Sequence, residues 1–189
     1  MNMLSALASV VRRGARWGAP GALTLLVACS SAPPAPLPTV PQLDLPSYLG
    51  AWYEVAMLPN RFQNQCVADT QARYRLRDDG RLEVLNRCRT ASGEVEAATG
   101  VADVVPGSAN AKLRVSFFRP FYGDYWVLAL GEGQRWALVG EPRRRFGWVL
   151  SRTPQLAPAE LAAALERAHA LGFDRSAFRL TPQTQPLAP

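Results

Sequence analysis

Apolar and polar residues alternate with a period of two over most of residues 50–152, and turn residues interrupt the alternation at intervals. From Ala72 the even positions of residues 67–77 are apolar, whereas arginines occupy the odd positions. Asp78-Asp79-Gly80 then supplies a turn, after which Leu82 and Val84 resume the apolar face. This pattern predicts half-buried β-strands joined by hairpins.

Eight strands are predicted in this way, with the spacing of an antiparallel meander. Eight antiparallel strands close into an up-and-down barrel wide enough to hold one small ligand, although periodicity alone also permits a β-sandwich. The predicted strands are residues 50–58, 67–77, 81–87, 94–104, 111–118, 124–130, 135–141 and 146–152.

One amphipathic helix follows the eighth strand and favours the barrel over the sandwich. Pro158 suits the first turn of a helix, Leu161 and Leu165 recur at helical spacing, and Gly172 supplies a stop. We therefore expect an all-β fold: an eight-stranded antiparallel barrel with a C-terminal α-helix packed outside and a short ninth strand at residues 177–180.

The N-terminus resembles a bacterial export signal. Arginines at positions 12, 13 and 16 precede an apolar run that is too short to cross a bilayer, which needs about 20 residues. The run ends in Leu26-Val27-Ala28-Cys29-Ser30-Ser31, which is similar to a lipobox. This similarity implies removal of residues 1–28, lipidation of Cys29 and, from Ser30, sorting to the outer membrane. An ordinary secretory signal is the alternative.

Removal of the signal lowers the charge of the working protein. The chain has 21 Lys+Arg against 15 Asp+Glu, and without three arginines its net charge falls from +6 to +3. A charge this small does not indicate a nucleic-acid partner. The run Arg143-Arg144-Arg145 predicts either a solvated turn or a contact with anionic lipid headgroups.

Composition divides the remaining chain into three parts. Residues 29–46 are rich in proline and predict an extended tether of about 3.1 Å per residue. Residues 47–180 have the size of one domain with one core, the predicted barrel. Residues 181–189 carry proline and glutamine with little to pack, which predicts a disordered tail.

Cysteine usage agrees with export. Lipidation of Cys29 leaves Cys66 and Cys88, an even pair that flanks the predicted turn at residues 78–80 and predicts a disulfide. His169, the sole histidine, is expected on the helix surface. No Ser-His-Asp, Cys-His or paired-carboxylate arrangement occurs, so the sequence predicts no metal site, no cofactor and no enzymatic activity.

Three segments resemble the signature blocks of the lipocalin family, in the family's order, on the predicted first, sixth and eighth strands. Residues 46–180 resemble in particular the bacterial outer-membrane lipocalin lipoproteins, relatives of apolipoprotein D and the plant temperature-induced lipocalins. The second block departs from the family by having Gly123 in place of threonine. The blocks are Gly50-Ala51-Trp52-Tyr53, Gly123-Asp124-Tyr125 and Trp148-Val149-Leu150-Ser151-Arg152-Thr153-Pro154.

The resemblance implies structural roles for two of these positions. Trp52 would close one end of the barrel, with the Arg152 guanidinium over its ring in a cation–π contact of about 1–2 kcal/mol. The remaining N–H groups of Arg152 would bind backbone carbonyls. The structural signature comprises Gly50, Trp52, Tyr53, Asp124, Tyr125 and Arg152.

Strand parity counted from Trp52 predicts the residues that face the barrel interior. They are mostly aliphatic and aromatic, which suits an acyl chain at about 0.8 kcal/mol per buried CH₂; packing against one another is the alternative. The predicted ligand contacts are Tyr74, Val84, Asn86, Val115, Phe117, Tyr125, Val127, Trp136, Trp148 and Leu150. The same parity holds for Ala56, Leu76, Leu113 and Leu138.

Two further segments fall where a lipocalin barrel opens. Arg61 and Phe62 lie on the first long loop, and residues 118–122 combine an arginine with three aromatic side chains. Both segments permit contact with a lipid headgroup. The first is equally consistent with a solvated loop, and the aromatic density of the second leaves a homodimer open.

The leading hypothesis is a membrane-anchored protein on the periplasmic side of the outer membrane. It would bind, store or transport fatty acids or lysophospholipids for membrane maintenance under stress. The alternatives are a lipocalin-fold enzyme, such as an isomerase or de-epoxidase of a lipid or isoprenoid, and an envelope lipoprotein with protein partners.

Overall fold

The structure is a computed structural model that describes residues 36–189. These residues belong to one compact unit. The predicted signal, the lipobox and Cys29 lie outside the described residues.

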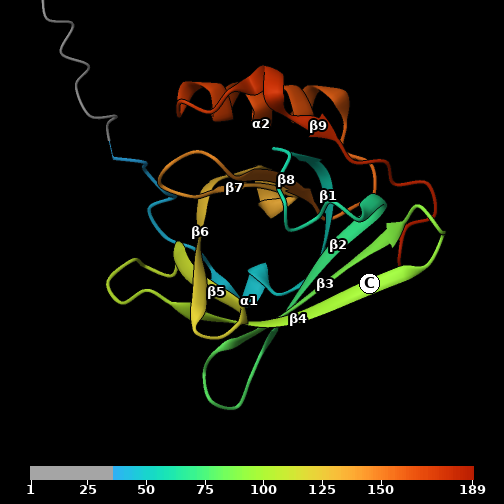
Figure 1. The fold of residues 1–189 in the computed structure, drawn as a ribbon. Helices are drawn as coiled ribbons and strands as arrows, with labels where there is room; N and C mark the ends of the chain where they lie inside the picture. Colours follow the sequence, from blue (N-terminus) through green and yellow to red (C-terminus); the bar gives the residue numbers. More distant parts are fainter. Residues whose placement is uncertain (1–35) are drawn as a thin grey trace, which may run out of the picture. The chain divides into compact units, whose positions relative to one another are not determined.

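Eight antiparallel strands form a closed barrel (Figure 1). The sheet runs in chain order from β2 to β8, continues to β1, and closes because β1 also pairs with β2. The predicted barrel is therefore confirmed. The strands are β1 Gly50–Met57, β2 Cys66–Leu76, β3 Leu82–Thr90, β4 Val95–Val104, β5 Lys112–Phe118, β6 Phe121–Leu130, β7 Trp136–Gly140 and β8 Gly147–Ser151.

Short elements complete the fold at both ends of the chain. The predicted helix is α2 Pro158–Ala170, and the predicted ninth strand is β9 Arg179–Leu180, which pairs with β1. A one-turn helix before the barrel, α1 Leu45–Tyr48, was not predicted. Two 3₁₀ turns, η1 Glu132–Gln134 and η2 Arg175–Ala177, lie in connections.

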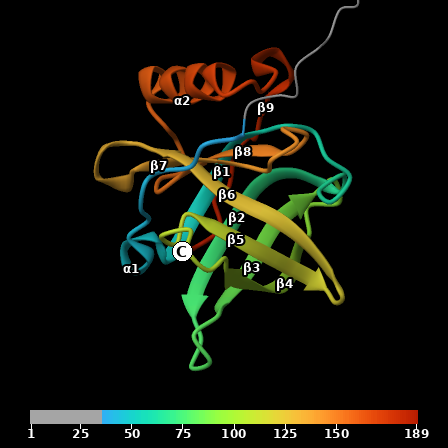
Figure 2. The ribbon, with the colours of Figure 1, turned by 90° about the vertical axis from the view of Figure 1, so that its left-hand side faces the viewer.

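Because successive strands are antiparallel, their connections alternate between the two ends of the barrel. The β2–β3, β4–β5 and β6–β7 connections share one end with α1, which we call the closed end. The β1–β2, β3–β4, β5–β6 and β7–β8 connections share the other end, the mouth. In Figure 2, α1 lies at the left, whereas the yellow β5–β6 hairpin and the teal β1–β2 loop reach the right.

Two apolar cores lie on opposite faces of the barrel wall. The first fills the closed half of the interior around Trp52. The second lies between α2 and the outer face, where Ala164 and Ala168 are fully buried. Phe173 follows α2 and packs directly against the backbone of Gly140, where a Cβ atom would lie 2.6 Å from the phenylalanine ring. The small residues thus let the helix and its following turn approach the wall closely.

Two β-bulges reverse the strand parity on which the predicted interior depends. One lies between Glu54 and Ala56 on β1, and the other lies between Val127 and Ala129 on β6, where it pairs with β7. A single extra residue turns every following side chain to the other face. The interior positions of β7 are therefore Ala137 and Val139. The prediction was wrong for Ala56, Trp136 and Leu138, which belong to the outer core.

The N-terminal segment begins to pack on the barrel well before residue 46. Leu37 and Leu43 are buried, one in each core. The backbone N–H of Val40 donates to the Val127 carbonyl at 3.0 Å, and that of Leu43 donates to the Ala109 carbonyl at 2.9 Å. The predicted tether is therefore too long at its C-terminal end, because isolated leucines between the prolines find apolar partners.

Residues 181–189, here called the C-terminal strap, lie along β1, β2 and β3 instead of trailing away. Pairing of β1 with β2 stops at Tyr53, and the strap occupies the split beyond it. The Gln183 amide nitrogen donates to the carbonyls of Glu54 and Thr70, both at 2.9 Å. Hydrogen bonds between backbone and side-chain amide groups thus order a segment that has little apolar surface to bury.

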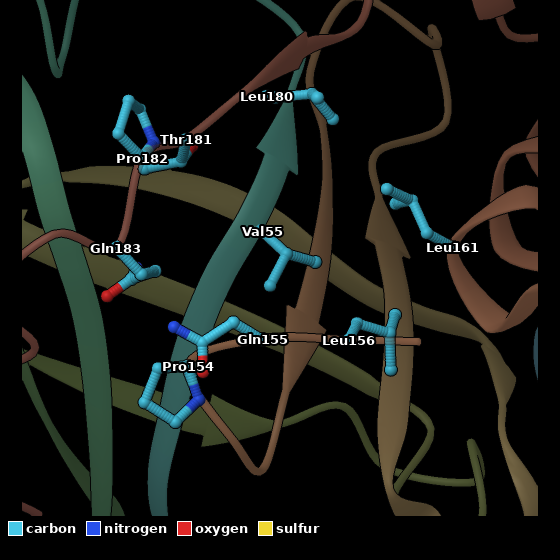
Figure 3. Close-up of a pocket in the computed structure, with 9 residues that line it drawn as sticks. All are labelled: Val55, Pro154, Gln155, Leu156, Leu161, Leu180, Thr181, Pro182 and Gln183. Atoms are coloured by element: carbon cyan, nitrogen blue, oxygen red, sulfur yellow. The ribbon is translucent and has the colours of Figure 1, made fainter. Parts of the chain in front are cut away.

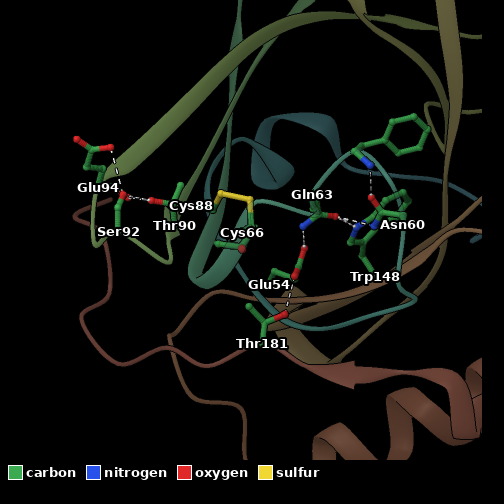
Figure 4. Close-up of a disulfide and its surroundings, with 12 residues drawn as sticks. Glu54, Asn60, Gln63, Cys66, Cys88, Thr90, Ser92, Glu94, Trp148 and Thr181 are labelled. Atoms are coloured by element: carbon green, nitrogen blue, oxygen red, sulfur yellow. Dashed lines mark hydrogen bonds between the residues drawn. A yellow bond between two sulfur atoms is a disulfide. The ribbon is translucent and has the colours of Figure 1, made fainter.

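The predicted disulfide between Cys66 and Cys88 is present, with Cα atoms 5.5 Å apart (Figure 4). It joins the mouth ends of β2 and β3. The same two strands are bound by the strap, so covalent and hydrogen-bonded links both reinforce this side of the mouth.

Candidate ligand-binding site

The closed end is sealed by Trp52 and Arg152. The indole is fully buried, and the guanidinium carbon lies 3.8 Å from its ring centroid. Arg152 Nη1 donates to the carbonyls of Leu49 at 2.9 Å and Ala51 at 3.1 Å. The chain can pass this close because Gly50 adopts a φ of +90°, which favours glycine. Burial lowers the Arg152 pKa, yet the group stays cationic.

Two of the three remaining signature side chains, Tyr53 and Asp124, point away from the interior. Tyr53 packs on the outer face, where its hydroxyl donates to the Leu187 carbonyl at 3.2 Å. Asp124 is exposed on β6. The second block therefore contributes only Tyr125 to the site.

Three tyrosines form a hydroxyl cluster above the sealed end. Tyr48 from α1 and Tyr74 from β2 each hydrogen-bond the Tyr125 hydroxyl, at 2.7 and 2.8 Å. Burial raises the pKa of all three, so the floor is polar but neutral. Two hydrogen bonds use two of three hydroxyl hydrogens, so within the described residues one O–H remains available for a ligand oxygen or water.

The predicted ligand contacts occupy three levels of the interior. Tyr74, Val84, Val127 and Leu150 are buried near the floor; Asn86, Val115, Tyr125 and Trp148 are partly buried; and Phe117 lies 45% exposed at the top of β5. Trp136 is absent from this set because it faces α2. Leu113 also lies inside, whereas Leu76 reaches past the floor and is half exposed.

The mouth end of β4 is exposed to solvent at residues 95–99. Within it, Ala98 and Glu96 share the inward-facing side of the strand with their partners Asn86 and Cys88 on β3. Further toward the floor, Gly100 on the same face is buried and would clash with Phe117 if it carried a Cβ. On β4 the inward-facing side above the aromatic floor therefore carries small residues, and Phe117 packs directly over Gly100.

A buried polar network holds the β1–β2 loop against the interior (Figure 4). Gln63 Nε2 donates to Glu54 at 2.8 Å, while Gln63 Oε1 accepts from Trp148 Nε1 at 2.8 Å and Asn60 Nδ2 at 2.9 Å. Thr181 of the strap donates to the other Glu54 oxygen at 2.5 Å. Burial raises the pKa of Glu54 despite these hydrogen bonds. A role for Glu54 was not predicted, although its parity with Trp52 places it inward.

Asn86 offers a polar contact at mid-height. Its Oδ1 is buried and has no hydrogen-bond partner among the described residues. A buried amide oxygen without a donor costs about 1–3 kcal/mol. A water or a ligand hydroxyl or amide in the interior would satisfy it.

The described chain also has a hollow outside the barrel, of about 400 Å³ (Figure 3). It lies between the outer face of β1, the β8–α2 connection, α2 and the strap. Val55, Leu156, Leu161 and Leu180 give it an apolar side, and Gln155 and Gln183 give it a polar one. It contains none of the predicted ligand contacts.

Other kinds of site find little support in residues 36–189. These residues contain no cluster of His, Cys, Asp or Glu that would hold a metal ion. In the same part of the chain, no helix has both the length and the apolar character to span a bilayer. His169 is exposed on α2, outside the barrel.

A barrel sealed at one end, open at the other and covered by one external helix defines the class of cup-shaped barrels that carry small ligands. The chain belongs to the lipocalin family. A family model described as a Lipocalin-like domain matches residues 43–183.

Relatives and solved structures agree with this assignment. The chain is 42% identical over 156 residues to "Outer membrane lipoprotein Blc" of Escherichia coli K12, covering 82% of this chain and 88% of the relative. It is 38% identical over 151 residues to "Temperature-induced lipocalin-1" of Arabidopsis thaliana, covering 75% and 80%. Insecticyanin from the tobacco hornworm shares the fold with a TM-score of 0.63 at 24% identity, covering 78% and 84%.

Proposed function

We propose that this chain is a lipid-anchored lipocalin of the bacterial outer membrane that holds the acyl chain of a fatty acid or lysophospholipid inside its barrel. The acyl chain enters at the mouth and ends at the tyrosine floor. The headgroup stays near the rim, on the periplasmic side of the membrane, and the protein serves in membrane maintenance.

The observation that carries this proposal is the apolar lining of the barrel interior above a sealed floor, with small residues on the inward-facing side of β4. Val84, Val115 and Trp148 provide apolar surface between Ala98 and the floor. Each methylene buried there contributes about 0.8 kcal/mol.

The anchor and the location rest on the sequence and the relatives. The lipobox-like segment supplies Cys29 for lipidation, and a relative 42% identical is named an outer membrane lipoprotein. We further propose binding without turnover. The single histidine lies outside the barrel, and Glu54, the buried acid nearest the interior, is already held by Gln63 and Thr181.

A matched pair of variants on β4 tests the site. Ala98 faces the interior, whereas its neighbour Ala97 pairs with Arg87 and faces out. Ala98→Phe places a ring inside the mouth half of the barrel and should weaken displacement of a dansyl-labelled fatty acid by palmitate or lysophosphatidylethanolamine at least tenfold. Ala97→Phe adds the same ring outside and should leave both affinities within about twofold. A tenfold loss corresponds to about 1.4 kcal/mol.

Tryptophan fluorescence gives an independent readout. Trp148 lies in the interior and should be quenched by a brominated fatty acid, and Trp148→Phe should remove most of that signal. Absence of saturable binding by any of these lipids would overturn the proposal. Equal losses in Ala98→Phe and Ala97→Phe would move the ligand out of the barrel.

A further inference from the structure

The most exposed aromatic side chains of the described chain gather at the mouth. Phe118 is 75% exposed, Phe121 69% and Phe62 56%. Phe118 and Phe121 stack on each other at the tip of the β5–β6 hairpin, with ring centroids 6.3 Å apart. Exposure on this scale is costly in water and marks a surface that meets a partner.

Arginines accompany these rings on three of the four mouth connections. Arg61 lies 5.5 Å from the Phe62 ring in the β1–β2 loop, and Arg145 lies 5.5 Å from the Phe146 ring in the β7–β8 loop. Arg119 is exposed within the β5–β6 tip, and Arg143 is exposed near Arg145. Among the described residues, no carboxylate forms a salt bridge with any of these four arginines. Unpaired cations beside exposed rings suit an apolar surface with anionic groups.

The loops that carry this surface are neighbours around the rim. Phe62 of the β1–β2 loop packs on Phe146 of the β7–β8 loop, with ring centroids 5.1 Å apart. The β5–β6 hairpin lies on the other side of the β7–β8 loop in the strand order. The fourth connection, between β3 and β4, instead carries the exposed acid Glu94, and the exposed Glu96 follows it at the start of β4. The mouth therefore has a basic, aromatic arc and an acidic sector.

We propose that this arc, formed by Arg61-Phe62, Phe118–Phe121 and Arg143–Phe146, docks the mouth onto an anionic phospholipid bilayer. The rings enter the interface while the guanidinium groups bind lipid phosphates. The acidic β3–β4 sector tilts away from the surface. Docking builds on the proposed function, because it brings the opening of the cup to the source of its acyl chains.

Charge favours a bilayer over a second copy of the chain. A symmetric dimer in which the two arcs face each other would bring the arginines of both copies together, and the arc itself carries no acid to offset them. An anionic surface instead attracts each of the four exposed arginines, Arg61, Arg119, Arg143 and Arg145. This attraction weakens with salt, since the Debye length falls from about 10 Å at 0.1 M to about 3 Å at 1 M.

The test uses residues 30–189, which lack the lipid anchor; the compact unit that contains both cores lies within them. The protein is sedimented with vesicles of phosphatidylcholine alone or with 30% phosphatidylglycerol. We expect binding to the anionic vesicles, weakened at least fivefold between 0.05 and 0.5 M NaCl. Phe118→Ser with Phe121→Ser, and separately Arg119→Glu with Arg143→Glu, should each lower the partition coefficient at least tenfold.

Matched controls lie away from the mouth. Leu76 is exposed at the closed end and Arg73 is exposed on β2, so Leu76→Ser and Arg73→Glu should change vesicle binding less than twofold. Failure of the wild type to bind anionic vesicles, or equal losses in the control variants, would overturn the proposal. So would concentration-dependent dimerisation abolished by the phenylalanine variant, with no vesicle binding.

Ligand binding is measured separately, so the two proposals fail independently. The phenylalanine variant should keep palmitate affinity in solution within threefold, because Phe118 and Phe121 lie above the buried part of the cup. Vesicle binding without palmitate binding would retain the docking surface and reject the carrier. Palmitate binding without vesicle binding would retain the carrier and reject the docking surface.

Discussion

The closed end and the mouth of this barrel are built from opposite kinds of contact. At the closed end, the aromatic rings of Tyr48, Trp52 and Tyr74 are buried, and Arg152 binds three backbone carbonyls. At the mouth, aromatic rings are exposed, and the loop that carries Phe62 is held by side-chain amides through Gln63.

The two ends therefore suit two different requirements of a ligand carrier. The floor has to stop a ligand at one depth, so it benefits from close packing and a neutral, pre-formed hydroxyl cluster. The mouth has to admit ligands and meet a surface, so it benefits from contacts that can open without unfolding the barrel. Loss of the floor should therefore affect global stability, whereas loss of mouth contacts should act locally.

The largest effect is expected at the floor. Trp52→Ala should lower the free energy of unfolding by about 3–5 kcal/mol, because it leaves a large cavity and strands Arg152. Urea denaturation followed by circular dichroism measures this loss. Phe118→Ala removes a ring of similar kind at the mouth and should change stability by less than about 0.5 kcal/mol. Similar losses in both variants would break the distinction between the two ends.

Much of the fold was predictable because local patterns carry it. Alternation around Tyr74 and Val84, hairpin turns such as Asp78-Asp79-Gly80, and the cysteine pair all report contacts between neighbours in sequence. The signature blocks identified the family, and Trp52 with Arg152 identified the closed end. These features depend on residue type and spacing, which a single sequence displays.

The rest depended on geometry that spacing does not reveal. The bulge on β6 leaves no clear mark in the sequence, yet it moves Trp136 and Leu138 from the interior to the face under α2. The strap was missed because its order comes from Asp69, Gln71 and Glu54, all distant in sequence. The buried network around Glu54 was not predicted because its partners Gln63 and Thr181 lie on separate segments.

Deletion of most of the strap should have an intermediate effect on the free energy of unfolding. Deletion of residues 182–189 leaves the buried Asp69 carboxylate without the backbone N–H groups of Thr184 and Gln185, which donate to it at 2.7 and 2.9 Å. Loss of donors to a buried charge should cost about 2–3 kcal/mol, partly spared by the remaining Arg89 contact.

Hydrogen exchange shows where the strap acts. Amides of β1 beyond Tyr53 and of the mouth half of β2 should exchange faster in the deletion variant, whereas those of residues 50–53 should be protected as in the wild type. Uniformly faster amide exchange across β1 would contradict a local role for the strap. It would mean that the strap stabilises the closed end as well as the mouth.

The smallest effect concerns Glu54 and has a defined pH dependence. Burial raises its folded-state pKa above the ordinary 4.5, so the folded chain holds this proton more tightly than the unfolded chain. Stability from Glu54 is therefore full below about pH 4.5 and falls as pH rises through the folded pKa. Glu54→Gln carries no proton and should lack that fall. The wild type should therefore lose stability relative to Glu54→Gln as pH rises, by about 1.4 kcal/mol for each unit by which the folded-state pKa exceeds the unfolded one.

Urea denaturation of both proteins between pH 4 and 8 measures the slopes, and groups common to both cancel in the difference. Glu94→Gln, on the exposed β3–β4 hairpin, should follow the wild type throughout. Parallel profiles for wild type and Glu54→Gln would mean that the Glu54 carboxylate is ionised equally in both states. The Gln63 network would then hold the mouth loop equally at every pH, and the contrast between a pH-independent floor and a pH-dependent mouth would vanish.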